Sequence, residues 1–211
     1  MIRLLLVLLM AGVVSHGEAA AEGLALVTTV TGSVSRLVDS APRALEPFAR
    51  LKQGDVLLLE GKAGVRLIFF GSRREESWRG EGRIEVGSGQ GKGSGLEEPQ
   101  VRVLPELVAR QIAKTPSTDR PERAPTGRMR SIEIGESSLA KLDSDYGRLR
   151  KDAAADDINP EIFLLAGLFE MREFGRLEQT LKDLSNSQPG NMELAVLNSL
   201  YKRAITQKQQ R

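Results

Sequence analysis

The sequence predicts an α+β protein in which a small antiparallel all-β domain is followed by a C-terminal bundle of helices. Residues 27–86 contain short runs of β-branched and aromatic residues bounded by glycine and aspartate. This composition is typical of half-buried strands joined by tight turns. After Gly135 the apolar residues recur at three- and four-residue spacing, which indicates helices. A chain of 211 residues is long enough to form two small domains with their own cores.

Residues 1–21 have the order of a secretory signal peptide. Arg3 gives a positive start, residues 4–14 are uncharged and mostly apolar, and alanines at 19–21 provide small residues for cleavage. We expect cleavage after Ala21 and a periplasmic or secreted product. The apolar run is shorter than the ~20 residues that a membrane-spanning helix needs. We therefore expect no transmembrane segment in the mature chain.

The residue types argue against catalysis. His16 is the only histidine, and the sequence contains no cysteine. Because His16 lies in the predicted signal peptide, the mature chain would lack both residue types. Ser-His and Cys-His nucleophilic catalysis and the usual zinc ligand sets are then excluded. We expect no enzyme, no metal site and no cofactor. A formal net charge of +2 gives no argument for nucleic acid as a partner.

The all-β domain is expected over residues 22–113. Residues 24–30 and 33–38 predict strands, because β-branched and apolar residues dominate or alternate there. Thr31 and Gly32 predict a turn or bulge between them, and residues 39–43 predict a turn after the second strand.

Two further strands are predicted at residues 56–59 and 65–69, with a reversal of the chain at 62–64 between them. Residues 83–86 and 100–104 alternate between polar and apolar side chains and predict additional strands. Short, closely spaced strands of this kind favour a small antiparallel sheet, sandwich or β-roll.

Three segments of this domain share a pattern of glycines and apolar residues. They are Val30-Thr31-Gly32-Ser33-Val34, Leu51-Lys52-Gln53-Gly54-Asp55-Val56-Leu57 and Gly64-Val65-Arg66-Leu67-Ile68-Phe69. Over about residues 24–104 this succession resembles the exported domain of FecR-type proteins. The resemblance implies an all-β envelope domain that acts by binding other proteins. The family's founding members carry a transmembrane helix, so secreted FecR-like modules are the closer comparison.

Residues 87–95 alternate glycine with serine, glutamine and lysine. A phosphate-binding loop ending at Gly91-Lys92 would need glycine where Val86 stands, and serine or threonine where Gly93 stands. We interpret the run as a flexible hairpin tip or connector.

A Pro-rich linker is predicted over residues 114–135, with 131–134 as a strand that could return to the β domain. A helical domain is expected over 136–206, followed by a frayed polar tail at 207–211. Asn159-Pro160 predicts a helix start, with asparagine at the cap and proline at the first helical position.

The stretch from Pro160 to Ala204 resembles tetratricopeptide-type helical hairpins. Its Leu-Ala-Gly segment, its Gly-containing turn and Pro189-Gly190-Asn191 carry the resemblance. Domains of this type commonly present a protein-binding surface.

Candidate partner-binding residues are the aromatic side chains and their arginine neighbours: Trp78, Arg74, Arg79, Phe169, Phe174 and Tyr201. Trp78 could bind a sugar or a partner, or could fill the core or a sheet face. The paired carboxylates, including Glu75-Glu76, are interpreted as structural or surface groups because charged side chains are mostly exposed.

Two functions are consistent with these features. The first is a non-catalytic exported interaction or scaffold protein that binds an unidentified envelope protein. The alternative is a peptidoglycan- or carbohydrate-binding envelope protein that uses Trp78.

Overall fold

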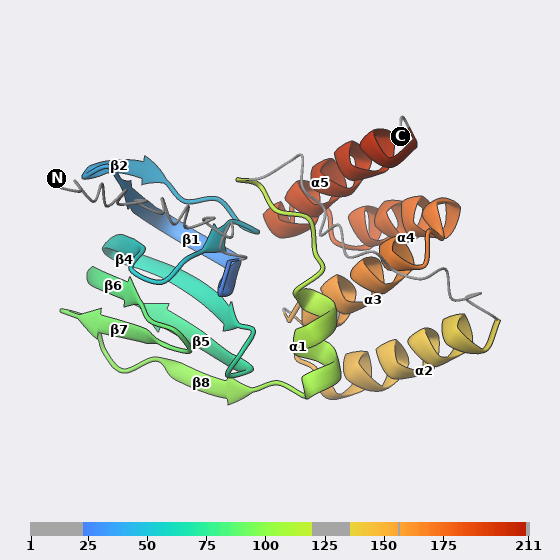
Figure 1. The fold of residues 1–211 in the computed structure, drawn as a ribbon, viewed down its shortest axis with the longest axis horizontal. Coiled ribbons are helices and arrows are strands. Elements are labelled where there is room, and N and C mark those ends of the chain that lie inside the picture. Colours follow the sequence, from blue (N-terminus) through green and yellow to red (C-terminus); the bar gives the residue numbers. More distant parts are fainter. Residues whose placement is uncertain (1–22, 120–135, 156, 210–211) are drawn as a thin grey trace, which may run out of the picture.

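The structure, a computed structural model, describes residues 23–119, 136–155 and 157–209. The predicted signal peptide and the strand predicted at 131–134 lie outside the described residues. Within the described ranges, an eight-stranded antiparallel sheet is followed by five helices. The prediction of an α+β fold is therefore confirmed (Figure 1).

The strands, in chain order, are β1 (Ala25–Val38), β2 (Ala41–Ala44), β3 (Arg50–Leu51), β4 (Val56–Phe69), β5 (Arg74–Arg79), β6 (Gly82–Val86), β7 (Gly91–Ser94) and β8 (Gln100–Val103). The helices are α1 (Glu106–Ile112), α2 (Glu136–Asp152), α3 (Asn159–Glu170), α4 (Phe174–Ser187) and α5 (Met192–Gln209).

Two long strands, β1 and β4, form the frame of the sheet. Each has 14 residues, and they pair antiparallel with a register shift between Thr31 and Ser33. This confirms the predicted bulge at Thr31-Gly32. Near the shift, Gly61 of β4 has a φ of 61°, which favours glycine because it has no Cβ. The first half of β4 pairs with β6 and the second half with β5, so the strand serves two parts of a bent sheet.

The predicted chain reversal at residues 62–64 is wrong. On both sides of the bend β4 keeps its ladder to β1, with Glu60 opposite Ser33 and Gly64 opposite Thr31. A bulge bends a strand and increases its twist without ending the ladder. The glycines that suggested a turn therefore mark the bend of one continuous strand.

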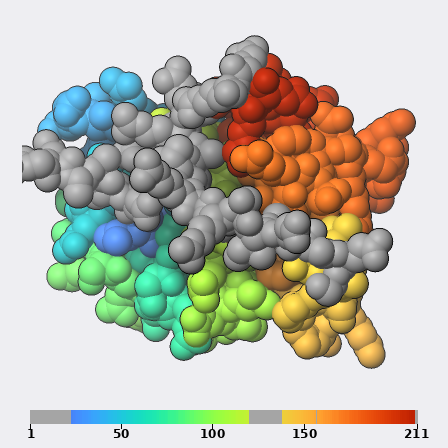
Figure 2. Space-filling model, turned by 45° about the vertical axis from the view of Figure 1, so that its right-hand side comes forward, coloured from blue at the N-terminus to red at the C-terminus, as the bar shows by residue number. Residues whose placement is uncertain are grey.

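The helices cover one face of the sheet. Leu26 of β1 lies opposite Ile68 of β4, and both belong to a buried cluster with Ile112, Ile162 and Leu165 of α1 and α3. Figure 2 shows α1 (yellow-green) between the strands (blue to green) and α2 (yellow-orange). The other face of the sheet has its own buried core, formed by Val27, Val34, Leu57, Leu67, Phe69, Trp78, Ile84 and their neighbours.

The segment after β8 is packed into the fold, which the sequence analysis did not predict. Leu104, Val108 and Ile112 are buried at four-residue spacing, a helical signal that could have revealed α1. The predicted linker begins at residue 114, yet Thr115 and Ser117 are buried. The N–H of Thr118 donates to the carbonyl of Phe48 at 3.2 Å. Residues 114–119 are therefore attached to the sheet.

The glycine-rich run is a hairpin whose second half is strand β7. The N–H of Gly87 donates to the carbonyl of Gln90 at 2.9 Å and closes the turn. β7 then pairs with β6 and lies against the indole of Trp78, where a Cβ on Gly93 would be 2.4 Å from Trp78 Cζ3. The interpretation as a hairpin is confirmed, but residues 91–94 belong to the sheet, where the glycines of β7 make room for the indole.

Two helix boundaries differ from the prediction. α3 begins at Asn159 with Ile158 at its cap, so Asn159 is the first helical residue. α5 extends to Gln209, into the predicted polar tail. The ammonium group of Lys208 lies 4.3 Å from the ring centroid of Phe169, a cation–π contact that favours helix at this end.

We predict that Gly93→Ala destabilises the fold by about 1–3 kcal/mol, because the added methyl group overlaps the Trp78 indole. Chemical denaturation measures this loss. Gly71→Ala is the matched control, since a Cβ there meets no atom within 4 Å, and its effect should stay within about 0.5 kcal/mol. Equal losses in the two variants would contradict the packing role of β7.

We predict that Asp119 contributes stability that depends on pH. Burial alone would raise the pKa of Asp119, but the Arg50 N–H, the Ser117 hydroxyl and the charge of Arg36 outweigh it and lower the pKa below 3.8. The folded state then binds this proton less readily than the unfolded state. The difference in unfolding free energy between the wild type and Asp119→Asn should be full above about pH 4 and shrink as pH falls below it. A difference that grows on acidification would contradict this.

Candidate functional site

Strand β8 forms an open edge of the sheet. It follows β5 at the end of the strand order and pairs with no other described strand, as Figure 1 shows at the lower margin of the sheet. All four of its residues are exposed. Val101 and Val103 are 44% and 60% exposed, although they are β-branched apolar residues. Pro99 and Pro105 flank the strand.

The backbone of β8 presents free hydrogen-bonding groups along this edge. The N–H of Leu104 donates to the carbonyl of Arg73 at 2.9 Å. In an antiparallel ladder, successive residues direct their backbone groups to opposite sides. Those of Arg102 and Leu104 therefore face β5, whereas those of Val101 and Val103 face away from the sheet.

Two other edges of the described sheet, β2 and β7, have features that oppose pairing. β2 contains Pro42 and Arg43, and proline and charged residues are common means of blocking an edge strand. β7 alternates glycine with Lys92 and Ser94 and so offers little apolar surface. β8 has neither proline nor glycine between its ends, and its valines suit a strand-to-strand contact.

A polar network, here called the Arg102 bridge, joins β8 to the helices through Glu75, Arg102, Asp157 and Asn159. The Arg102 side chain is 50% exposed, and the other three residues are buried. Arg102 Nε donates to Glu75 Oε2 at 2.7 Å, and Arg102 Nη2 donates to Asp157 Oδ2 at 2.8 Å. Asn159 Nδ2 donates to Glu75 Oε1 at 2.6 Å, and its N–H donates to Asp157 Oδ1 at 3.0 Å. All four oxygens of the two carboxylates therefore accept hydrogen bonds.

The two carboxylates of the bridge, Glu75 and Asp157, stabilise the positive charge of Arg102 at its centre. Burial alone would lower the pKa of Arg102, but its hydrogen bonds to Asp157 and Glu75 and their negative charges raise the pKa. The Glu75 and Asp157 side chains are 5% and 7% exposed, so both depend on Arg102 to offset the cost of burying a charge.

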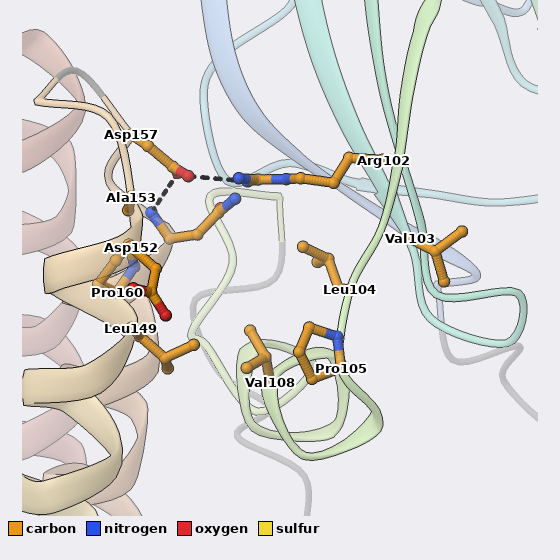
Figure 3. Close-up of a pocket in the computed structure, with 11 residues that line it drawn as sticks. Arg102, Val103, Leu104, Pro105, Val108, Leu149, Asp152, Ala153, Asp157 and Pro160 are labelled. Atoms are coloured by element: carbon orange, nitrogen blue, oxygen red, sulfur yellow. Dashed lines mark hydrogen bonds and ion pairs between the residues drawn. The ribbon is translucent and has the colours of Figure 1, made fainter.

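Two pockets lie along β8 on the side of the Arg102 bridge. Pocket 1, of about 120 Å³, is mainly apolar, with Leu104, Pro105 and Val108 facing Leu149 and Pro160 across it (Figure 3). Its lining residues are Arg102, Val103, Leu104, Pro105, Val108, Leu149, Asp152, Ala153, Asp157, Asn159 and Pro160.

Pocket 2, of about 280 Å³, is more polar. Its lining residues are Arg66, Glu75, Ser77, Gln100, Val101, Arg102, Ala154 and Asp157. Arg102 and Asp157 line both pockets, and the ion pair between them separates the two.

The chemistry of this site suits binding. Glu75 and Asp157 each accept hydrogen bonds from Arg102 and Asn159, so both carboxylates are held in contacts that join β8 to the helices. Across the part of the chain that the structure describes, no group of three or more His, Cys, Asp or Glu side chains could hold a metal ion. No helix among the described residues is long and apolar enough to cross a membrane.

Three of the predicted partner-binding residues lie on β5. Trp78 is 4% exposed and donates from Nε1 to Glu76 Oε2 at 3.1 Å. Arg74 pairs with the same carboxylate at 3.1 Å, while Arg79 is exposed. The Trp78 indole occupies the inner core, and its faces are not available to stack on a sugar ring in this structure.

The other three predicted residues form an aromatic cluster among the helices. The ring centroid of Phe169 is 5.9 Å from that of Phe174 and 5.5 Å from that of Tyr201. Phe169 and Tyr201 are 4% and 0% exposed. The cluster joins α3, α4 and α5, and it is separate from the β8 edge.

The residues of the Arg102 bridge were not predicted from the sequence. Glu75 and Glu76 were interpreted as structural or surface groups, but they are 4% and 0% exposed, so a surface position is wrong for both. Their burial follows from pairing with Arg102 and with Trp78. The alternation of valine with Gln100 and Arg102 was the available sign of a strand with one polar and one apolar face.

Comparisons with protein-family models, with curated proteins and with solved structures found no match for this chain. The resemblance to FecR-type exported domains stays a prediction.

We predict that Arg102→Met destabilises the fold by about 2 kcal/mol, because it removes the cation that pairs with both buried carboxylates, Glu75 and Asp157. Arg110→Met is the matched control on the neighbouring helix. Arg110 is 75% exposed and lies 3.9 Å from Glu106, so its loss should cost less than about 0.5 kcal/mol. Denaturant titration of both variants measures the difference, and equal effects would contradict a structural role for the bridge.

Proposed function

We propose that this chain is a non-catalytic exported protein of the bacterial envelope that binds another protein. An extended segment of that partner pairs with β8 and adds a strand to the sheet. The observation that carries the proposal is the open β8 edge, with two exposed valines and two adjacent pockets. Addition of an extended segment to a free sheet edge is a common mode of peptide recognition. In that mode, backbone hydrogen bonds provide affinity and pockets for alternate side chains provide specificity.

The position of β8 supports this role. Arg102 holds the strand to the start of α3 through Asp157 at 2.8 Å, and the next segment, α1, is packed between sheet and helices. A rigid edge loses little conformational entropy when a partner strand is added, so more of the interaction energy appears as affinity. The predicted signal peptide supports an envelope location.

No contact of Trp78 favours the alternative of a peptidoglycan or carbohydrate ligand, because its indole packs against β7. The experiment below nevertheless includes the polymer, so that a cell-wall ligand would be recognised.

The test is in-cell photo-crosslinking from β8. A photoreactive residue at position 103 should form an adduct with an envelope protein, whereas one at position 43 on the β2 edge should not. Val101→Pro should abolish the adduct, because it removes an outward N–H. Val101→Thr keeps the N–H and should preserve the adduct.

An adduct that persists in Val101→Pro would contradict the proposal, and so would equal adducts from positions 43 and 103. Sedimentation of the chain with purified peptidoglycan, without any protein adduct, would support the polymer alternative instead.

A further inference from the structure

In pocket 2 the carboxylate acceptors have hydrogen-bond donors from the protein, whereas several donors have no acceptor among the described residues. Its two carboxylates, Glu75 and Asp157, accept hydrogen bonds on all their oxygens from Arg102 and Asn159. They are also nearly buried. The positive charge of Arg102 partly offsets their negative charges toward a ligand.

The donors of the same pocket remain available. Arg66 Nε lies 3.4 Å from Ser77 Oγ and 3.9 Å from Glu75 Oε1, which are weak contacts. Its two terminal nitrogens have no hydrogen-bond partner among the described residues, and the exposed Gln100 amide likewise has none there. A guanidinium has five donor hydrogens and no acceptor, so pocket 2 is rich in donors and complements an anion.

The position of Arg66 favours anion binding in pocket 2. It lies on β4 in the interior of the sheet, opposite Ser77 of β5, and its side chain is 25% exposed. A partly buried guanidinium binds a carboxylate more strongly than an exposed one, because the surroundings screen the charges less.

A strand added to β8 would bring alternate side chains to the pockets. Side chains of Gln100 and Arg102 lie on the helix-facing side, and those of Val101 and Val103 on the other. In the added strand, residues i, i+2 and i+4 share one face. The residue opposite Gln100 would lie over pocket 2 and the residue opposite Leu104, four positions away, over pocket 1, on the two sides of the Arg102–Asp157 pair.

Pocket 1 complements an apolar side chain. Leu104, Val108, Leu149 and Pro160 are among the apolar residues that line it. The one further carboxylate in its lining, Asp152, belongs to an exposed residue at the end of α2, where solvent screens its charge.

We infer that the partner segment is an extended peptide with an acidic side chain four positions from an apolar one. The acidic carboxylate binds Arg66 and Gln100 in pocket 2, and the apolar side chain fills pocket 1. This inference rests on the proposed strand addition at β8 and specifies the chemistry of the segment that is added.

The test uses synthetic ten-residue peptides with β-branched residues at the other central positions, and fluorescence anisotropy with the purified full chain. Peptides carry Glu, Gln or Lys four positions before or after a leucine, because either strand direction can be used. For one of the two orders, Glu before leucine or Glu after leucine, the Glu peptide should bind at least about tenfold more tightly than the matching Gln peptide. This is the effect of one charge-assisted hydrogen bond.

Variants separate this inference from the proposed function. Arg66→Gln should remove the preference for Glu over Gln, whereas Arg43→Gln on β2 should leave it unchanged. Val101→Pro should abolish binding of every peptide. Circular dichroism and denaturation of each variant establish that it is folded.

If peptides bind and Val101→Pro abolishes binding, but Glu, Gln and Lys peptides are equivalent or Lys is preferred, the inference is wrong and strand addition stands. If no peptide binds, or binding is indifferent to Val101→Pro, strand addition at β8 fails and the inference fails with it.

Discussion

The rest of the structure depends on one hydrophobic contact between sheet and helices. In this contact Leu26 and Ile68 of the sheet pack against α1 and α3. The bent sheet buries an inner core of its own, but these two side chains face outward and need a cover. The helices provide it and share their hydrophobic core with the sheet. The two predicted domains are therefore packed as one body, and α1, together with residues 114–119, is fixed where sheet and helices meet.

Toward β8 the same face of the sheet changes from apolar to polar. Ile68 lies opposite Glu75, and Glu75 lies opposite Arg102. Burial of Glu75 requires a cation and further donors, which Arg102 and Asn159 supply. This polar network ends the hydrophobic contact between sheet and helices, and beyond it the edge is exposed and the pockets begin. The open site thus follows from the point at which the apolar cover of the sheet stops.

The sequence predicts the fold class and most elements because apolar periodicity records burial on one face. It predicts too few strands around β5, where charged residues at 74–76 conceal pairing with Trp78 and Arg102. It divides β4 in two because glycine at 61 and 64 is compatible with either a turn or a bend. The Arg102 bridge was not predictable, since it joins Glu75 to Asn159 across 84 positions, and no local spacing reports such a contact. The aromatic candidates were chosen by residue type, and three of them are core residues, as large aromatic side chains usually are.

The central claim is that β8 has an open edge, and amide hydrogen exchange of its four residues in the free chain tests it most directly. The account predicts alternation: the amides of Arg102 and Leu104 are protected by β5, while those of Val101 and Val103 exchange at nearly the rate of an unstructured peptide. Protection of Val101 and Val103 in the free chain would contradict the account, because it would mean that the edge is already occupied.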